Sequence, residues 1–485
     1  MLFRRLAFSL NEEGWTAAGC RENSVPLERV ASGASCPRAR QEARLIGMAS
    51  YKTVTTVCHP DGTFLTTTTF SEYEETMAAA ATHLAAQTAP PGGTVLVPGG
   101  AGYIGSHTVR SLVGEGYKVV VIDNLCNGNA ESVDPAATFE NVDLADLEAV
   151  RQVFKRHKPD AVIDFAAFLA VGESMADPAS YMQTNVVNFV NVMDAMKEFG
   201  CKNIIKSSTS STYGDPSDPN EFPLKEDYQD RYCQTITESA LGNGTANYLA
   251  EPKEMEGEEF FQSFLADYGS KFGSRDELIF NQAELRKLRV PMSIYGLTKL
   301  MDEIIMAKYE ALYGIRWTAL RYFNVCGAAV EGDIGEAKAK PATLMTMAIY
   351  YLLGKRDKMS IMGTDYPTKD GTAVRDYIHP ADLATAHIAA LRLLQRTGKA
   401  EVFNLGNGEG STVKEVLAAV ERASGKKIDA AAVPRRSGDP AKSYCDPSRA
   451  NTILKWRPQF DLDAMAETAW KWHSTHPNGF EGNPK

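Results

Sequence analysis

Short apolar runs alternate with amphipathic stretches through the middle of the chain. The runs have the length of buried strands, and the stretches between them have the spacing of helices with one apolar face. This alternation predicts an α/β fold, a Rossmann-type doubly wound parallel sheet with helices on both faces. Ligands bind such sheets at the carboxyl ends of the strands. The expected strands are 94–97, 118–122, 161–165, 203–208 and 317–322, and the expected helices include 181–199 and 295–313.

After residue 324 the alternation loosens, and the pattern predicts a smaller α/β domain that closes over the sheet edge. We therefore expect a larger domain at 94–325 and a smaller one at 326–480. The elements expected in the smaller domain are helices 342–353, 381–397, 413–424 and 462–475, with strands 359–362 and 401–405.

Three further segments stand apart from this alternation. Residues 1–47 mix seven Arg with five Glu and lack an apolar segment typical of targeting peptides, so we expect a disordered extension. Residues 48–93 predict an appended hairpin, with strands at 51–57 and 63–70, then a helix at 71–87 and a linker. An insertion at 229–289 separates a strand from the next helix; a loop of this length is usually functional, a partner site or disordered.

Composition excludes several classes of partner. The formal net charge of the 485 residues is −10, which argues against nucleic acid because binding there depends on neutralising phosphates. The eight cysteines are scattered without a CxxC pair, so we expect no metal site and a reduced, cytoplasmic compartment. No run of 18 apolar residues predicts a membrane span.

A glycine-rich turn joins the first two strands of the large domain. Gly99 permits the tight turn, Gly102 lets the backbone approach a diphosphate, and Gly105 allows the helix to pack close to the sheet. The phosphates would lie on the free N–H groups of the helix N-terminus. Asp123 ends the second strand, where a carboxylate binds ribose hydroxyls and repels a 2′-phosphate, so NAD is favoured over NADP. A glycine turn that binds nothing is the alternative.

A phenol and an ammonium share one face of the helix expected at 295–313. Tyr295 and Lys299 are four residues apart, and a fixed cation lowers the pKa of a phenol from its usual value of ~10. A tyrosinate at this place could remove a proton from a hydroxyl group. The spacing alone is common on solvated helices, but here it follows a dinucleotide motif and the strand-end segment Ser207-Ser208-Thr209.

The chain resembles the extended short-chain dehydrogenase/reductase family and, within it, the UDP-glucose (UDP-galactose) 4-epimerases. The resemblance covers about residues 94–480 without the insertion. The most specific match is GTDYPTKDGTAVRDYIHPADLA at 363–384. The other matches are PGGAGYIGSHT at 98–108, IDNLCN at 122–127, FAAFLAVGES at 165–174, SSTSSTYGD at 207–215, YGLTK at 295–299, RYFNVCGA at 321–328 and RRSGDP at 435–440.

The resemblance implies an isomerase that oxidises carbon 4 of a UDP-sugar transiently and reduces it again on the other face, with NAD tightly held. Tyr295 would take the 4-hydroxyl proton, Thr209 would relay it, and Lys299 would hold the nicotinamide ribose. It also implies an NAD-binding domain at 94–325, a UDP-sugar-binding domain at 326–480 and a homodimer. The implied cofactor-binding residues are Gly99, Gly102, Tyr103, Ile104, Gly105, Asp123, Asn124, Asn127, Asp143, Leu144, Phe165, Ala166, Ala167, Asn185, Ser207, Tyr295, Lys299 and Tyr322.

On the substrate side the resemblance implies arginines for the diphosphate, whose oxygens match their planar forks. Leu169 stands where some members of the family have a Lys against the cofactor, which should weaken NAD retention. Ser443 stands where a bulky Tyr restricts some epimerases, so an N-acetylated sugar should also fit. The implied substrate-binding residues are Thr209, Tyr295, Asn324, Leu344, Arg375, Arg436, Asp439 and Ser443.

Two other functions remain open from the sequence. A UDP-sugar dehydratase or decarboxylase of the same superfamily is one, but a dehydratase needs an Asp-Glu pair near Thr209, and residues 208–213 contain no acid. A non-catalytic NAD-binding protein is the other, with the insertion and the N-terminal element used for partner contacts.

Overall fold

The structure is a computed structural model in which two compact units, residues 1–89 and 90–485, are described separately. The extension at 1–47, the helix expected at 71–87, the insertion at 229–289, Arg436 and Asp439 lie outside the described residues. In the first unit, β1 (Thr56–Cys58) and β2 (Phe64–Thr66) pair antiparallel, as the expected hairpin requires. The described residues are 56–58, 64–66, 93–214, 222–226, 291–338, 343–435 and 440–480.

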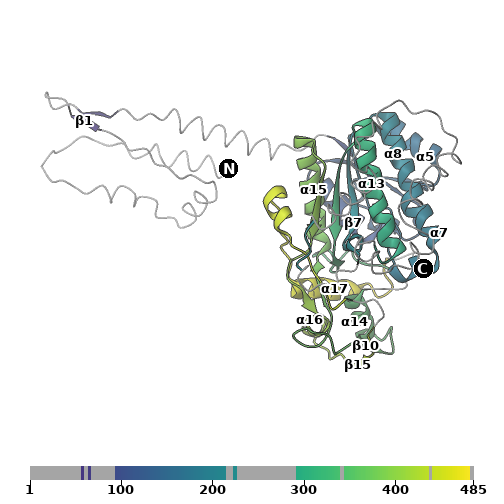
Figure 1. Ribbon diagram of the computed structural model, residues 1–485, viewed down its shortest axis with the longest axis vertical. Helices are drawn as coiled ribbons and strands as arrows, with labels where there is room; N and C mark the ends of the chain where they lie inside the picture. Colours follow the sequence, from purple (N-terminus) through teal and green to yellow (C-terminus); the bar gives the residue numbers. More distant parts are fainter. Residues whose placement is uncertain are drawn as a thin grey trace, which may run out of the picture. The chain divides into compact units, whose positions relative to one another are not determined.

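The second unit is built on a seven-stranded sheet of order β13-β8-β7-β6-β3-β4-β5, in which every pair is parallel. This confirms the predicted doubly wound α/β fold (Figure 1). The strands are β3 (Thr94–Pro98), β4 (Lys118–Asp123), β5 (Thr138–Asn141), β6 (Ala161–Asp164), β7 (Asn203–Thr209), β8 (Arg316–Tyr322) and β13 (Glu401–Leu405).

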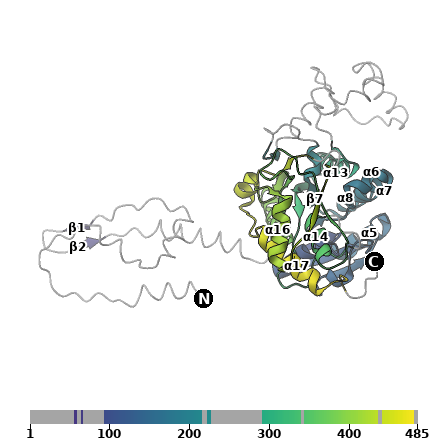
Figure 2. The same cartoon turned by 90° about the horizontal axis from the view of Figure 1, so that it is seen from below.

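Helices cover both faces of this sheet (Figures 1 and 2). Leu96, Val162 and Ile204 point into one core, shared with α5, α8 and α13. Val97 and Ile163 point into the opposite core, shared with α4 and α15. Because both faces are buried, the strands are continuously apolar. The covering helices are α4 (Tyr103–Gly114), α5 (Leu147–His157), α8 (Asn188–Phe199), α13 (Ile294–Tyr313) and α15 (Pro380–Thr397).

Two elements expected in the smaller domain, β13 and α15, are part of the larger one instead: the first is a strand of its sheet and the second a helix packed on that sheet. β13 pairs with β8, with Glu401 opposite Thr318, and α15 packs against α4. After residue 325 the chain therefore returns to the large sheet, where it contributes to the core that contains Val97 and Ile163. Short segments complete the large sheet's surroundings: η2 (Ala130–Ser132), α6 (Val171–Ala176), α7 (Pro178–Tyr181), η3 (Met182–Val187), η4 (Ser210–Tyr213) and η7 (Ala450–Leu454).

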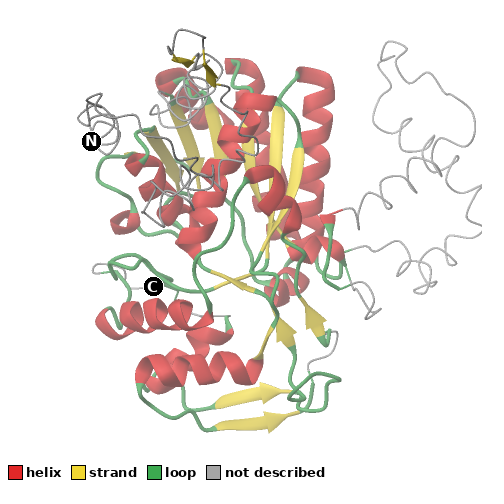
Figure 3. Ribbon diagram, turned by 90° about the vertical axis from the view of Figure 1, so that its left-hand side faces the viewer, coloured by secondary structure: helices red, strands yellow, loops and turns green. Residues whose placement is uncertain are grey.

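The smaller part has its own core, formed by α14 (Leu344–Leu352), α16 (Val413–Ser424) and α17 (Leu462–Thr475) against the parallel pair β10 (Met359–Met362) and β15 (Ala430–Val433) (Figure 3). Among the described residues no helix is long and apolar enough to cross a membrane. The strands between the two cores are β9 (Asn324–Val325), β11 (Val374–Arg375), β12 (Tyr377–Ile378), β14 (Ser411–Thr412) and β16 (Lys442–Ser443).

Candidate active site

The glycine turn between β3 and α4 has the close approaches that its spacing predicts. Gly99 has φ +73°, and a Cβ there would lie 2.7 Å from the backbone N of Ala166. A Cβ on Gly105 would lie 2.3 Å from the carbonyl O of Gly99. Gly102 differs, because only the Gly99 carbonyl lies within 4 Å of its Cβ position, at 3.2 Å. Gly102 therefore keeps space open in front of the α4 N-terminus, as a diphosphate would require.

Asp123, at the end of β4, holds the same turn from the other side. Its carboxylate accepts the backbone N–H of Ala101 at 3.1 Å and that of Leu125 at 2.8 Å. A Cβ on Gly128 would lie 2.8 Å from an Asp123 oxygen. Asp123 thus organises the loop around it in addition to the ribose contact that the sequence predicts.

A single cavity brings most of the predicted cofactor residues together at the carboxyl ends of the strands. Asn185 is the exception, since it is buried behind the cavity, where its amide bonds the backbone of Phe168 and the hydroxyl of Thr298. The predicted residues that line the cavity are Gly99, Gly102, Tyr103, Ile104, Gly105, Asp123, Asn124, Asn127, Asp143, Leu144, Phe165, Ala166, Ala167, Ser207, Tyr295, Lys299 and Tyr322.

Tyr295 lies in the first turn of α13, at the wall of this cavity. Ser293 caps the helix by accepting the N–H of Gly296, and the hydroxyl of Ser174 accepts the N–H of Tyr295 at 3.1 Å. Burial raises the pKa of Tyr295 to about 12, and a hydrogen bond with Thr209 acts in the opposite direction. The lowered phenol pKa expected from the sequence is not found, because among the protein's own groups the effect of burial is larger.

Lys299 lies one turn later and is buried. Its ammonium donates to the carbonyl O of Ser207 at 3.0 Å and to the hydroxyl of Ser207 at 3.3 Å. Burial, followed by repulsion from Lys206, lowers its pKa to about 8. The start of α13 therefore places a phenol and an ammonium at the cavity wall, and Thr209, at the end of β7, hydrogen-bonds the phenol without lining the cavity itself.

Tyr322, which lines the cavity, is hydrogen-bonded on its far side to the buried His387. The phenol of Tyr322 contacts Nε2 of His387 at 2.5 Å, and Nδ1 of His387 lies 2.7 Å from the carbonyl O of Leu383. Nδ1 must carry the proton to donate to that carbonyl, so Nε2 accepts from Tyr322. Burial lowers the pKa of His387 to about 4, so the imidazole is neutral at physiological pH.

Three of the predicted substrate residues, Asn324, Arg375 and Ser443, lie on the short strands β9, β11 and β16. Arg375 and Ser443 lie directly opposite each other in the pairing of β11 with β16. Asn324, on β9, donates its side-chain amide to the carbonyl O of Asp376 at 2.8 Å. Leu344 begins α14. Of these four side chains none lines the cofactor cavity.

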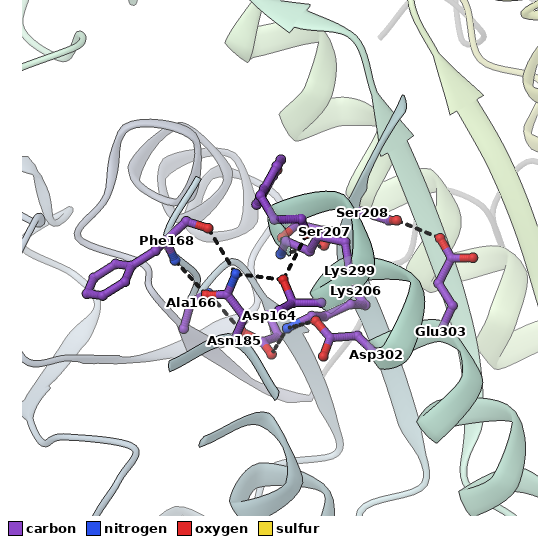
Figure 4. A network of polar contacts seen from close by, with 12 residues as sticks. Asp164, Ala166, Phe168, Asn185, Lys206, Ser207, Ser208, Lys299, Asp302 and Glu303 are labelled. Atoms are coloured by element: carbon purple, nitrogen blue, oxygen red, sulfur yellow. Dashed lines mark hydrogen bonds and ion pairs between the residues drawn. The ribbon is translucent and has the colours of Figure 1, made fainter. Parts of the chain in front are cut away.

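Sequence reasoning missed several residues of this region. Lys338 and Phe168 line the cavity, beside the Leu169 that the sequence does single out, and the Lys338 ammonium lies 3.7 Å from Glu336. Below Lys299, the buried Lys206 contacts Asp164 at 2.7 Å (Figure 4). Lys206 carried a signal in the sequence, because a lysine inside an apolar strand needs a carboxylate. Lys338 carried none, because loop side chains are placed by tertiary contacts.

A buried ion pair between Arg321 of β8 and Glu303 of α13 lies next to the end of β7. Arg321 donates to Glu303 through two nitrogens, at 3.0 and 2.6 Å, and the hydroxyl of Ser208 donates to the same carboxylate at 2.5 Å. Arg321 also lies over the ring of Tyr213. Glu303 is therefore fully engaged, and its charge is balanced locally.

Comparisons with known proteins agree with this geometry. The model of the NAD dependent epimerase/dehydratase family matches residues 95–237 and 268–406. A UDP-glucose 4-epimerase from Lacticaseibacillus casei is 38% identical over 388 residues, which cover 80% of this chain and 98% of that protein. One from Drosophila melanogaster is 35% identical over 410 residues, covering 81% and 99%.

Solved structures give the same result. A UDP-glucose 4-epimerase from Brucella ovis in complex with NAD matches with a TM-score of 0.63 at 34% identity, covering 78% of this chain and 97% of that one. The UDP-Glc/GlcNAc 4-epimerase from Campylobacter jejuni matches with a TM-score of 0.60 at 32% identity, covering 79% and 99%.

Proposed function

Because the chain belongs to the NAD dependent epimerase/dehydratase family, we propose that it is an NAD-dependent UDP-sugar 4-epimerase that interconverts UDP-galactose and UDP-glucose. The observation that carries the proposal is that Tyr295 and Lys299 line the cavity that begins at the glycine turn, with Thr209 hydrogen-bonded to Tyr295. A non-catalytic dinucleotide-binding protein has no need of this group.

The residues present fit NAD. The open space at Gly102 suits a diphosphate, and the Asp123 carboxylate suits an unphosphorylated ribose. Lys299 would hold the nicotinamide ribose with the ammonium donor that remains after its two bonds to Ser207. When bound, NAD supplies reversible hydride acceptance at carbon 4 of the sugar.

The protein's own residues move the proton. Tyr295 accepts the proton of the 4-hydroxyl as that carbon is oxidised, and Thr209, which hydrogen-bonds Tyr295, holds the reacting oxygen and relays the proton. The Lys299 ammonium favours the tyrosinate, since an opposite charge lowers the pKa of a phenol. The proton returns when the sugar is reduced on its other face, so no net oxidation occurs.

A turnover assay tests this proposal. Purified full-length chain is given UDP-galactose without added reductant, with and without NAD, and UDP-glucose formation is followed. We expect conversion, and we expect Tyr295→Phe to remove it while NAD stays bound. A protein that binds NAD but converts neither sugar would contradict the proposal and favour the partner-binding alternative.

Substrate binding is proposed to involve Asn324, Leu344, Arg375, Arg436, Asp439 and Ser443, with UDP held between the cofactor cavity and the smaller domain at 326–480. The small side chain of Ser443, opposite Arg375, supports acceptance of UDP-N-acetylglucosamine as well. The C. jejuni relative is named for both sugars. No turnover of the N-acetylated sugar by a chain that converts UDP-galactose would refute this part, and Ser443→Tyr should suppress it selectively.

We also propose a homodimer. Exposed apolar side chains lie on α13 and on the adjacent η3, namely Ile304, Leu312 and Val187. Light scattering after gel filtration should give twice the mass of 52.9 kDa. Ile304→Lys should give monomers, whereas Val330→Lys, at an exposed apolar position outside these helices, should not. A cytoplasmic location is proposed from the free thiols Cys126, Cys201, Cys326 and Cys445 of the described part, and a tagged chain would test it.

A further inference from the structure

A lysine stands at a core position of the central sheet. Lys206 follows Ile204 on the face of β7 that packs against α8 and α13, and it is fully buried. Its ammonium lies 2.7 Å from Asp164, 3.3 Å from Asp302 and 4.0 Å from the ring centroid of Phe189. Figure 4 shows the ammonium between the two carboxylates, with Lys299 beside them. We call Asp164, Lys206 and Asp302 the buried triad.

Stability alone gives no reason for Asp302. It is fully buried, and neither of its oxygens has a well-aligned hydrogen bond within the described part of the chain. Removing a carboxylate from water is costly unless it is paired and hydrogen-bonded. Asp164 is better satisfied, because it also accepts the N–H of Ala166 at 2.8 Å, next to the cofactor cavity.

The triad carries a net charge of −1 when all three groups are ionised, and Lys299 carries +1. Because both lysines are buried, Lys206 alone would repel the Lys299 ammonium, whereas Asp302 and Asp164 attract it. Lys206 also contacts both carboxylates, so neither needs to pair with Lys299 directly. The Lys299 donors therefore remain directed at Ser207 and the cavity.

We propose that Asp164, Lys206 and Asp302 are positioning residues for the reaction: together they hold one negative charge behind Lys299, which keeps its ammonium charged and free to bind the nicotinamide ribose. The proposal rests on the proposed function, since it assigns Lys299 to NAD. It predicts that the net charge of the triad matters more than any one of its members.

The other groups that face this region from neighbouring elements are balanced, neutral or, in the case of Glu173, exposed to solvent. Glu303, also on α13, is paired with Arg321 of β8. From η3 the facing group is the amide of Asn185, and from α6 it is the hydroxyl of Ser174, with the exposed Glu173 bonded to Tyr181. From the sheet they are Ser207 and the phenol of Tyr322, and from α13 itself the phenol of Tyr295. Because Glu303 is paired with Arg321, the triad supplies the net uncompensated charge among the groups that act on Lys299.

Two variants separate charge from structure. Asp302→Asn changes the net charge of the triad from −1 to 0. Adding Lys206→Met returns it to −1 with Asp164 as the remaining carboxylate. The single variant should therefore lower the pKa of Lys299, and the double variant should restore it. A purely structural ion pair makes the opposite prediction, since the double variant loses every contact of Lys206.

The measured quantities are the NAD dissociation constant as a function of pH, by calorimetry, and the basic limb of the pH profile of turnover. NAD affinity should fall as Lys299 loses its proton, near pH 8 in the parent. With Asp302→Asn we expect this fall to move down by about one pH unit, a shift typical of losing one nearby charge. With the double variant it should return to the parent position.

The control is Asp382→Asn, which removes another buried carboxylate, on α15. It accepts the backbone N–H groups of Gln459 and Phe460, and it lines no part of the cavity. We expect this control to have a lower melting temperature, while the pH at which its NAD affinity falls stays that of the parent. If Asp302→Asn does not fold, Lys206→Met/Asp302→Asn and Lys206→Met/Asp164→Asn, both of net charge −1, should match the parent.

The proposal would be overturned if NAD affinity fell at the same pH in Asp302→Asn as in the parent. It would also be overturned if the double variant showed the same downward shift as the single one. The NAD-binding measurement needs no turnover. A chain that binds NAD with the expected pH shifts but converts no UDP-sugar would therefore contradict the proposed function and leave the role of the triad supported.

Discussion

The two glycines at the turn allow a sharp test, because they should have different roles. Gly99→Ala places a side chain on a residue with φ +73° and brings its Cβ to 2.7 Å from the Ala166 nitrogen and 2.8 Å from the Phe165 carbonyl carbon. The left-handed conformation costs ~1–2 kcal/mol, and an overlap with backbone that cannot move aside costs a further ~1–3 kcal/mol. The expected loss of stability is therefore about 2–5 kcal/mol.

Gly102→Ala is the matched control. Gly102 has φ −82° and ψ 174°, which any residue adopts, and its Cβ would meet only the Gly99 carbonyl, at 3.2 Å. Glycine is preferred to alanine at a helix N-cap, so this substitution costs roughly 0.5–1 kcal/mol. The new methyl group would occupy the space proposed for the diphosphate, so we expect NAD to bind about 10- to 100-fold more weakly, or ~1.4–2.8 kcal/mol.

Denaturant unfolding and calorimetric NAD titration on both variants distinguish the two roles. Gly99→Ala should lose about 2–5 kcal/mol of stability as well as NAD binding, and Gly102→Ala should lose mainly NAD binding. Equal destabilisation by the two changes, or normal NAD affinity in Gly102→Ala, would refute the reasoning.

Three further predictions concern single residues. Tyr295→Phe should reduce kcat by about 10²–10⁴-fold while the NAD dissociation constant changes little, because a general base is lost; parent-like turnover would contradict its role. Asp123→Ser should raise affinity for NADP relative to NAD, since a carboxylate no longer opposes the 2′-phosphate, and titration with both dinucleotides measures it. His387→Gln concerns pH: the pKa of His387 is about 4 in the fold and ~6.5 in an unfolded chain, so the unfolded chain takes up the proton first. His387 therefore stabilises the fold above pH ~6.5 and loses this contribution toward pH 4, and the variant should show a smaller fall in unfolding free energy between pH 7.5 and 5.

Local signals explain the parts of the fold that could be predicted. The helix expected at 413–424 matches α16, because Thr412 and Glu415 form a capping box that marks its start and Gly425 ends it. The first strand and the glycine turn could be predicted because the spacing of Gly99, Gly102 and Gly105 after a short apolar run is itself a pattern of neighbouring residues. Such signals depend on residues close together in the chain, so one sequence is enough to find them.

The position of β13 could not be predicted in the same way. The strand at 401–405 was recognised, but its pairing with β8 joins residues about eighty positions apart, such as Glu401 and Thr318. An apolar strand of five residues fits either domain, and the choice is made by tertiary packing. The same limit applies to Lys338, whose place at the cavity depends on how a loop folds back.

Strand register explains the pairing within the buried triad, which the composition of the chain could not predict. In the pairing of β6 with β7, Asp164 lies directly opposite Lys206, and each is the fourth residue of its strand, after three buried positions. Two adjacent parallel strands that each place a charge at the same level of the core must pair those charges, since an unpaired one is too costly to bury. Asp302 then adds a second carboxylate from α13, three residues after Lys299. Asp164 already pairs with Lys206 at 2.7 Å, and Asp302 lies at 3.3 Å, so we infer that the additional negative charge acts on the Lys299 ammonium.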